Sequence, residues 1–169
     1  AVIILTSLNN FLAKVSYFIG ILIVAIMVMA LTLSAITRYI SGTGYDWLIE
    51  LPPVLVCWLV FPLLGPLLRE GNHIQVDFLA SLTSSRQAKI LKLLMNLTAL
   101  IASLVFFKAG VEATFLYFNL GQMMELEIDI PIWWMYLSFP VGFIILALFA
   151  LELTFQAIYY LNQKETKDA

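Results

Sequence analysis

One cysteine and one histidine are present among the 169 residues, and charged side chains are scarce. With Cys57 as its single cysteine, the chain forms no internal disulfide and lacks the second thiol that a disulfide oxidoreductase requires. His73 alone cannot supply the paired histidines that commonly hold haem in a helical bundle. The sequence contains neither a nucleophile motif of the G-x-S-x-G type nor a basic stripe suited to nucleic acid. We therefore expect no catalytic residue, no cofactor and no nucleic-acid partner.

Apolar side chains are what the sequence has in excess. Hydrophobic residues make up 62% of the chain and charged residues 12%, and the mean hydropathy is +0.97. Soluble domains average roughly half apolar and about a quarter charged residues. A soluble fold of this length could not hide so much apolar surface, so the sequence predicts an all-α integral membrane protein. No repeat or linker divides it, and residues 1–169 are expected to form a single membrane domain.

Long uncharged runs predict four transmembrane helices, because crossing a bilayer takes about 20 apolar residues. The second span holds four of the six prolines. Pro52 and Pro53 are expected to open its helix, and Pro62 and Pro66 to kink it. The fourth span is uncharged from residue 132 to 151, so titratable groups are expected at the membrane boundaries. The four spans are predicted at about residues 15–37, 51–68, 90–112 and 132–152.

The third predicted span carries polar groups at its ends and along one stripe. Ser84 followed by Gln87 matches a capping box at the helix start. Lys108 is expected to pair with Glu112, one turn along the helix, as an interfacial ion pair rather than as a proton relay. Small or partly polar residues also recur at helical spacing, which predicts close packing against another helix. They are Asn96, Ala99, Ser103 and Gly110.

The nine basic residues are distributed unevenly between the two sides of the predicted membrane domain. Seven lie at the termini or between the second and third spans: Lys14, Arg69, Arg86, Lys89, Lys92, Lys164 and Lys167. The other two, Arg38 and Lys108, fall on the opposite side. Because positive charge favours the cytoplasmic side of a membrane, both termini are predicted to be cytoplasmic.

A polar stretch between the second and third spans holds Arg69, Glu70, His73 and Asp77. The acids and the histidine could supply three metal ligands on one helical face, but a histidine beside carboxylates at a membrane boundary is more often a hydrogen-bonded structural residue. Periodicity is ambiguous between helix and strand. An exposed strand edge is not tolerated in lipid, so we expect a short interfacial helix here. Glu50 is likewise expected to be an interfacial carboxylate near a helix start rather than a functional intramembrane acid.

Several short motifs follow one another in a fixed order between residues 38 and 149. They are Arg38-Tyr39, Trp47-x-x-Glu50-Leu51, Trp58, the polar stretch described above and the sequence PIWWMYLSFPVGF in the last span. In their order, spacing and placement, the chain resembles the small membrane (Q) subunit of tripartite ATP-independent periplasmic (TRAP) transporters. The residues that match the family pattern are Arg38, Trp47, Glu50, Trp58, Arg69, Glu70, His73, Asp77, Pro131, Trp133, Tyr136, Pro140 and Gly142.

The resemblance implies a role that composition could not indicate. In such transporters a periplasmic protein captures an organic anion, and a large membrane subunit carries it inward by a sodium-coupled elevator movement. The small subunit is expected to be part of the static scaffold in the bacterial inner membrane. Its implied partners are the large subunit in a stable complex, the periplasmic binding protein in a transient one, and membrane lipids.

The loops on the predicted periplasmic side are expected to help dock the binding protein. The residues of this docking surface are Arg38, Tyr45, Asp46, Glu125, Glu127 and Asp129. Two other hypotheses stay open from the residues themselves: a small membrane enzyme or redox carrier that uses His73 and nearby acids, and a self-assembling four-span channel. Few ligands and nucleophiles are present for the first, and the second should show a polar stripe along a whole span.

Overall fold

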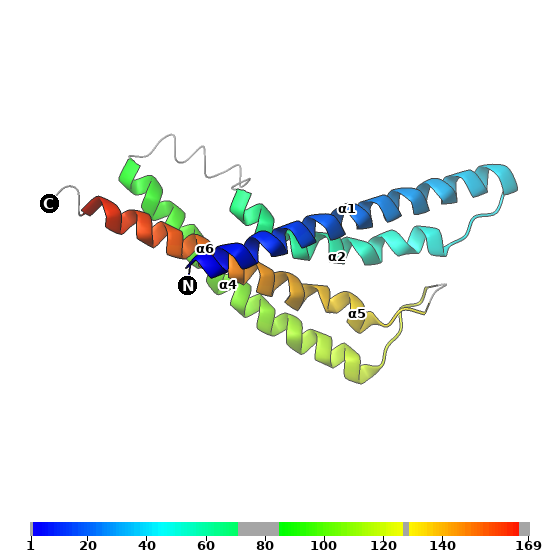
Figure 1. The fold of residues 1–169 in the computed structure, drawn as a ribbon. Helices are drawn as coiled ribbons and strands as arrows, with labels where there is room; N and C mark the ends of the chain where they lie inside the picture. The colour runs from blue at the N-terminus through cyan, green and yellow to red at the C-terminus, as the bar shows by residue number, and fades with distance from the viewer. Residues whose placement is uncertain (1, 71–84, 127–128, 166–169) are drawn as a thin grey trace.

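A computed structural model describes residues 2–70, 85–126 and 129–165 of the chain (Figure 1). Within these ranges the regular structure is helical, apart from one isolated β-bridge in the loop after α4. Four helical stretches of the described chain are long and apolar enough to cross a membrane, which confirms the predicted number: Ile4–Ser41, Trp47–Glu70, Ile90–Leu120 and Ile132–Tyr159. The helices are α1 (Val2–Ser41), α2 (Trp47–Glu70), α4 (Ser85–Leu120), α5 (Ile132–Tyr136) and α6 (Ser138–Glu165). The expected interfacial helix and the capping residue Ser84 lie outside the described residues.

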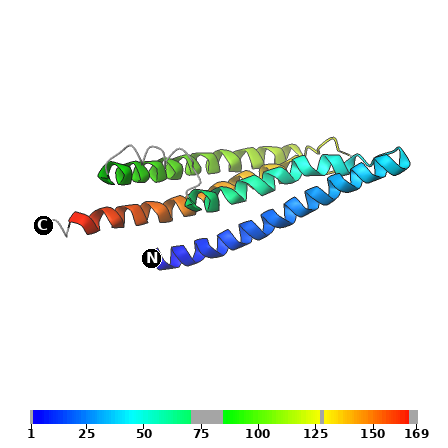
Figure 2. The same ribbon diagram turned by 90° about the horizontal axis from the view of Figure 1, so that it is seen from above.

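Helix α6 is the centre of the bundle. It packs against α4 on one side and α2 on the other, and it also contacts α1 and α5. Helix α1 packs mainly on α2, whereas α4 contacts only α5 and α6 among the described helices. The loops at 42–46 and 121–131 lie toward one end of the bundle and the chain termini toward the other (Figures 1 and 2). One flank of α4 is consequently left without a neighbour among the described helices.

Two helices begin earlier than the sequence predicted. Helix α1 starts at Val2, so Lys14 lies within it rather than before it. Helix α2 starts at Trp47, and all four of its prolines lie inside it. The expectation that Pro52 and Pro53 open the helix was wrong, because the backbone N–H groups of Ile49 and Glu50 already donate to the Asp46 carbonyl. The helical backbone continues through all four prolines to Glu70.

Glycines in the left-handed conformation end the two helices that run toward the loop end. Gly42 follows α1 with φ 70°, and Gly121 follows α4 with φ 60°. Only a residue without Cβ adopts this conformation readily, so both are helix-terminating positions. After Gly121 the chain folds back on itself, with the Met124 N–H 2.9 Å from the Ile130 carbonyl. Pro131 then caps the start of α5 in an extended conformation.

Glycines also allow α6 to approach its neighbours closely. A Cβ on Gly142 would lie 2.5 Å from the carbonyl carbon and oxygen of Phe61 in α2. A Cβ on Gly65 of α2 would lie 2.7 Å from the ring of Phe149, which is fully buried in α6. On the opposite side of α6, Gly110 of α4 sits against Pro140. Helix pairs in membranes are stabilised by such close packing, because lipid supplies little hydrophobic drive for association.

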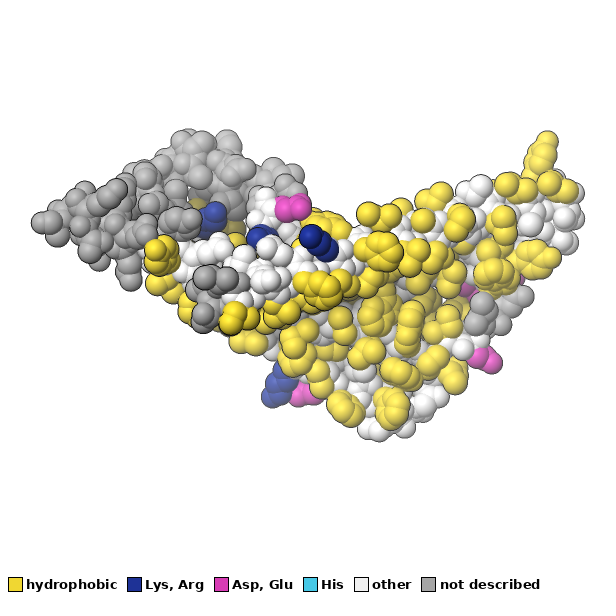
Figure 3. Space-filling view, in the orientation of Figure 1, with side chains coloured by type: hydrophobic (Ala, Val, Ile, Leu, Met, Phe, Trp, Pro, Cys, Tyr) yellow, Lys and Arg dark blue, Asp and Glu magenta, His cyan; other side chains and the backbone are white. Residues whose placement is uncertain are grey.

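The outer surface is largely apolar. Hydrophobic side chains cover most of the described face in Figure 3, interrupted by few charges. Helix α4 is the most exposed of the four spans: 11% of its most apolar stretch is buried, against 39% in the stretch formed by α5 and α6. These surfaces suit contact with lipid or with another membrane protein.

Candidate functional site

The acidic side chain of Glu152 on α6 is fully buried in the bundle, with 0% exposure. The side-chain amide of Asn9 in α1, also at 0% exposure, donates to Glu152 Oε2 over 2.6 Å and to the Leu148 carbonyl over 3.1 Å. The amide of Gln156 donates to Glu152 Oε1 over 3.1 Å. A buried acid is tolerated when such donors satisfy it. We call Asn9, Glu152 and Gln156 the buried polar cluster.

Sequence reasoning missed this cluster. It treated the fourth span as uncharged through Leu151 and expected every titratable group at a membrane boundary. The sequence predicted that the fourth span ends near residue 152, whereas α6 continues to Glu165, several turns beyond Glu152. The available signal was the apolar sequence on both sides of Glu152, together with Gln156 one helical turn later. Chemically the cluster is a carboxyl held by amides, and it ties the first helix to the last.

Two further polar contacts join α1 to the end of α2. Arg69 Nη1 donates to Asn10 Oδ1 over 2.6 Å, and the Tyr17 hydroxyl donates to Glu70 Oε1 over 2.5 Å. The predicted residues Arg69 and Glu70 thus join two helices at the end of the bundle that holds the termini. His73 and Asp77, the rest of that polar stretch, lie outside the described residues, so the metal hypothesis for them stays untested.

The opposite end carries an aromatic cluster built largely from residues that the sequence had singled out. Trp58 Nε1 donates to the Trp134 carbonyl over 3.2 Å, and the two ring centroids lie 5.3 Å apart. Tyr136 stacks on Tyr117 of α4 with a centroid distance of 4.3 Å. Trp133 meets Phe118 edge to face at 5.6 Å. Tryptophan and tyrosine concentrate at membrane interfaces, so this end of the bundle fits an interfacial level.

The residues of the predicted periplasmic docking surface lie at this aromatic end. Arg38 Nη2 is 3.7 Å from Asp46 Oδ1, and both side chains are exposed. Tyr45, Glu125 and Asp129 are exposed as well, and Glu127 lies outside the described residues. The surface is solvent-accessible and of mixed charge.

Trp47 and Glu50 lie in the first turn of α2, as predicted for Glu50. Both line a small depression together with Leu126 and Ile130 of the loop after α4. This contact places the loop beside the start of α2.

The small-residue stripe of the third span faces α6. Asn96 and Ser103 are buried, and Gly110 sits against Pro140 and Phe139. The prediction of close helix packing is confirmed. The predicted Lys108–Glu112 pair is also present, with Lys108 Nζ 3.8 Å from Glu112 Oε1. That pair points away from α6, with exposed side-chain fractions of 80% and 68%.

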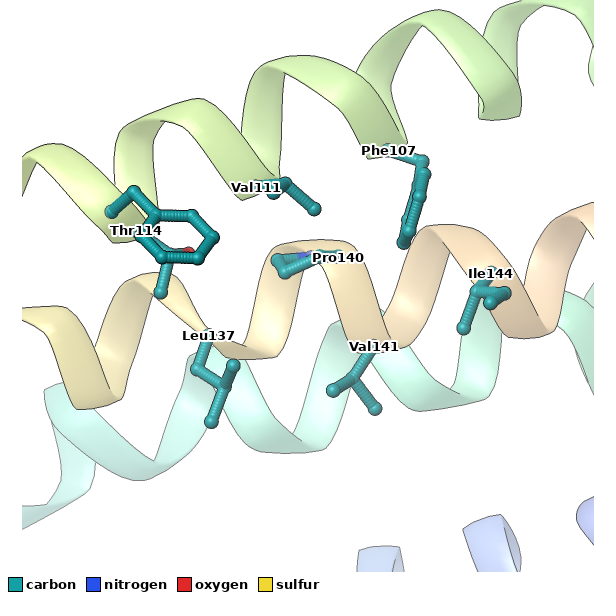
Figure 4. Close-up of a pocket in the computed structure, with 8 residues that line it drawn as sticks. Phe107, Val111, Thr114, Leu137, Pro140, Val141 and Ile144 are labelled. Atoms are coloured by element: carbon teal, nitrogen blue, oxygen red, sulfur yellow. The ribbon is translucent and has the colours of Figure 1, made fainter.

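An apolar groove of about 240 Å³ runs between α4 and the start of α6 (Figure 4). Its walls are Phe107, Val111, Thr114, Phe115, Leu137, Pro140, Val141 and Ile144. The one hydroxyl among them, on Thr114, donates to the Gly110 carbonyl and is occupied. The groove can hold an apolar group and offers no reactive one. Across the described ranges, no set of three histidine, cysteine or acidic side chains is placed to hold a metal ion.

Comparison with known families identifies the chain. The model of the family described as "Tripartite ATP-independent periplasmic transporters, DctQ component" matches residues 10–159. A search of curated proteins found no match. The family match covers the four spans, the aromatic cluster and the buried polar cluster apart from Asn9, whose neighbour Asn10 is the first residue matched. Since it takes in nearly the whole chain and agrees with the motifs, the protein belongs to the DctQ family, the small membrane component of TRAP transporters.

Proposed function

We propose that this chain is the static scaffold subunit of a TRAP transporter in the bacterial inner membrane. In that role it supports a large elevator-type subunit during sodium-coupled uptake of an organic anion delivered by a periplasmic binding protein. The family match supports the place of the chain in such a transporter. The further steps, including sodium coupling and the class of solute, rest on resemblance to the family.

The observation that best supports a scaffold is the interlocked interior of the bundle. Gly142 and Gly65 bring α2 and α6 into close contact, and the Asn9–Glu152 bond ties α1 to α6. Sodium-coupled sites favour broken helices with oxygen-rich clusters at mid-membrane. Here both carboxyl oxygens of the buried polar cluster already accept hydrogen bonds from amides of the same chain. Neither an enzyme nor a channel finds a specific supporting feature in the described residues.

A cross-linking experiment tests whether the bundle is static during transport. Tyr117→Cys and Tyr136→Cys, in a Cys57→Ser background, would join α4 to α5 through a short bis-maleimide, because the two rings stack at 4.3 Å. The cross-linked subunit, reconstituted with the large subunit and binding protein, should transport as well as the unlinked one. Transport abolished by the cross-link and restored with a cleavable linker would contradict the scaffold role.

The division of labour between subunits has its own test. Liposomes that contain this chain alone should neither accumulate solute nor bind sodium specifically. Sodium-dependent uptake by the purified chain without the large subunit would refute the proposal.

A further inference from the structure

The outward flank of α4 combines two features that lipid alone does not explain. The first is the exposed Lys108–Glu112 ion pair. The second is the apolar groove beside it, lined on α4 by Phe107, Val111 and Phe115. On a helix, Phe107 and Val111 immediately precede Lys108 and Glu112, so the groove and the ion pair form neighbouring stripes. We call these two stripes the α4 flank.

The depth of the ion pair follows from contacts between α4 and its neighbours. Tyr117 stacks on Tyr136 at the aromatic end of the bundle. Counted from Tyr117 along α4 at about 1.5 Å per residue, toward the end of the bundle that holds the termini, Glu112 is about 7 Å away and Lys108 about 13 Å away. Toward the opposite end, Lys92 is about 24 Å from Lys108 on the same scale. Since the hydrocarbon core is about 30 Å thick, Lys108 lies well inside it.

Packing across α4 and α6 gives the same depth independently. Phe106, two residues before Lys108, stacks on Phe143 at 5.2 Å, and Gly110, two residues after it, contacts Pro140. Counted along α5 and α6, Phe143 is about 14 Å from Trp134 and about 14 Å from Glu152 in the other direction. Lys108 is therefore level with the middle of the predicted fourth span, deeper than the interfacial position expected from the sequence.

Charges at this depth are costly when they face lipid. Membrane proteins therefore turn such residues toward a protein interior, a cavity or a partner. A lysine near a helix end can extend to the interface, but Lys108 is about one turn deeper than Glu112, with which it pairs. Among the described helices, α4 contacts only α5 and α6, so no other described helix covers the pair.

We propose that a transmembrane helix of the large TRAP subunit binds against the α4 flank. This inference rests on the proposed function. The partner helix presents a hydrogen-bonding or charged side chain at mid-membrane to Lys108 and Glu112, and apolar side chains to the groove. Pro140 and Val141 line the groove on the α6 side (Figure 4). Polar contacts between helices stabilise such interfaces when small grooves allow close approach.

Photo-cross-linking in the complete complex tests whether the large subunit binds at the α4 flank. A benzoylphenylalanine probe at Phe115 lies in the groove, and the matched control is the same probe at Phe18 on α1; both native side chains are strongly exposed. The expected result is a cross-link from position 115 to the large subunit at more than twice the yield from position 18. A lower ratio would overturn the proposal, and a product with lipid alone at position 115 would identify the groove as an acyl-chain site instead.

Removing the ion pair tests its role and distinguishes a partner from lipid. The double variant Lys108→Leu/Glu112→Leu should associate with the large subunit about three- to thirtyfold more weakly, the range expected for interhelical polar contacts. If the pair faced lipid, the variant would associate equally well or better. The control is Arg38→Leu/Asp46→Leu, which removes another exposed ion pair with nearly the same separation. Measured without the binding protein, whose expected docking surface includes both residues, this control should associate with the large subunit as the native chain does.

Different results would contradict the proposed function and the α4 flank proposal. If the native chain does not co-purify with the large subunit at all, the proposed function fails. If it co-purifies but the probe at position 115 does not cross-link to the large subunit, only the α4 flank proposal fails.

Discussion

The side-chain amide of Asn9 lies 2.6 Å from the carboxyl oxygen of Glu152, although 143 positions separate the two residues in the sequence. Both side chains have no exposed surface. This bond joins the first helix of the bundle to the last, and its loss should lower the stability of the bundle more than the loss of the other polar contacts described above.

Replacing Asn9 should therefore destabilise the bundle far more than replacing its neighbour. Asn9→Leu removes the closest donor to Glu152, and losing a hydrogen bond to a buried acid costs about 1–3 kcal/mol. Asn10→Leu is the matched control, because Asn10 is exposed and its contact with Arg69 should contribute about 1 kcal/mol or less. Thermal unfolding of the purified subunit in detergent measures both. The double variant Asn9→Leu/Glu152→Leu should recover part of the loss, and equal effects of the two asparagines would contradict the assignment.

The close approach of α2 and α6 predicts a difference between two glycines. Gly142→Ala places a methyl group 2.5 Å from the Phe61 backbone, which cannot move aside easily, and should cost about 1–3 kcal/mol. Gly20→Ala places the same methyl group 3.2 Å from the flexible end of Leu63. Because alanine favours a helix over glycine by up to about 1 kcal/mol, that change should be neutral or stabilising. Unfolding midpoints of the two variants in the same detergent give the comparison, and a tolerated Gly142→Ala would mean that the helices are farther apart.

Labelling of single cysteines tests the predicted orientation. In a background without Cys57, a cysteine at the exposed position Thr43 should react with an impermeant maleimide from the periplasm. A cysteine at Ser84, between the second and third spans, should react only from the cytoplasm, because basic residues favour that side. The reverse pattern would invert the topology.

Salt should distinguish the two expected partners. The complex with the large subunit depends on apolar packing and short-range polar contacts, so it should survive about 0.5 M salt, where the Debye length is only a few Å. Docking of the binding protein at exposed Arg38, Asp46, Glu125 and Asp129 should weaken under the same conditions. Co-purification and surface binding assays across a salt series measure the two. Dissociation of the membrane complex by salt would indicate instead that charged contacts hold the interface between the two subunits.

Local sequence patterns predicted the number of spans, the Lys108–Glu112 pair and the close-packing stripe of Ser103 and Gly110. The number of spans depends on continuous apolar runs. The ion pair and the stripe depend on residues a few positions apart on one helix. The buried polar cluster could not be found in that way, because its key bond joins Asn9 to Glu152 from opposite ends of the chain.

The start of α2 shows a second limit of sequence reasoning. Pro52 and Pro53 suggested a helix start, but hydrogen bonds to Asp46 had already begun the helix. The mid-membrane depth proposed for Lys108 likewise rests on the contact between Gly110 and Pro140, which sequence spacing does not give.

The central place of α6 has a consequence for the synthesis of the chain. Helices α1, α2 and α4 leave the ribosome before the one helix that contacts them all. Until α6 enters the membrane, the Asn9 amide has no Glu152 to bind, and α4 has no neighbour among the other two long helices. Nascent chains that stop short of α6 should therefore stay open and be recognised by membrane proteases, so that insertion of the last helix marks a subunit as ready for assembly.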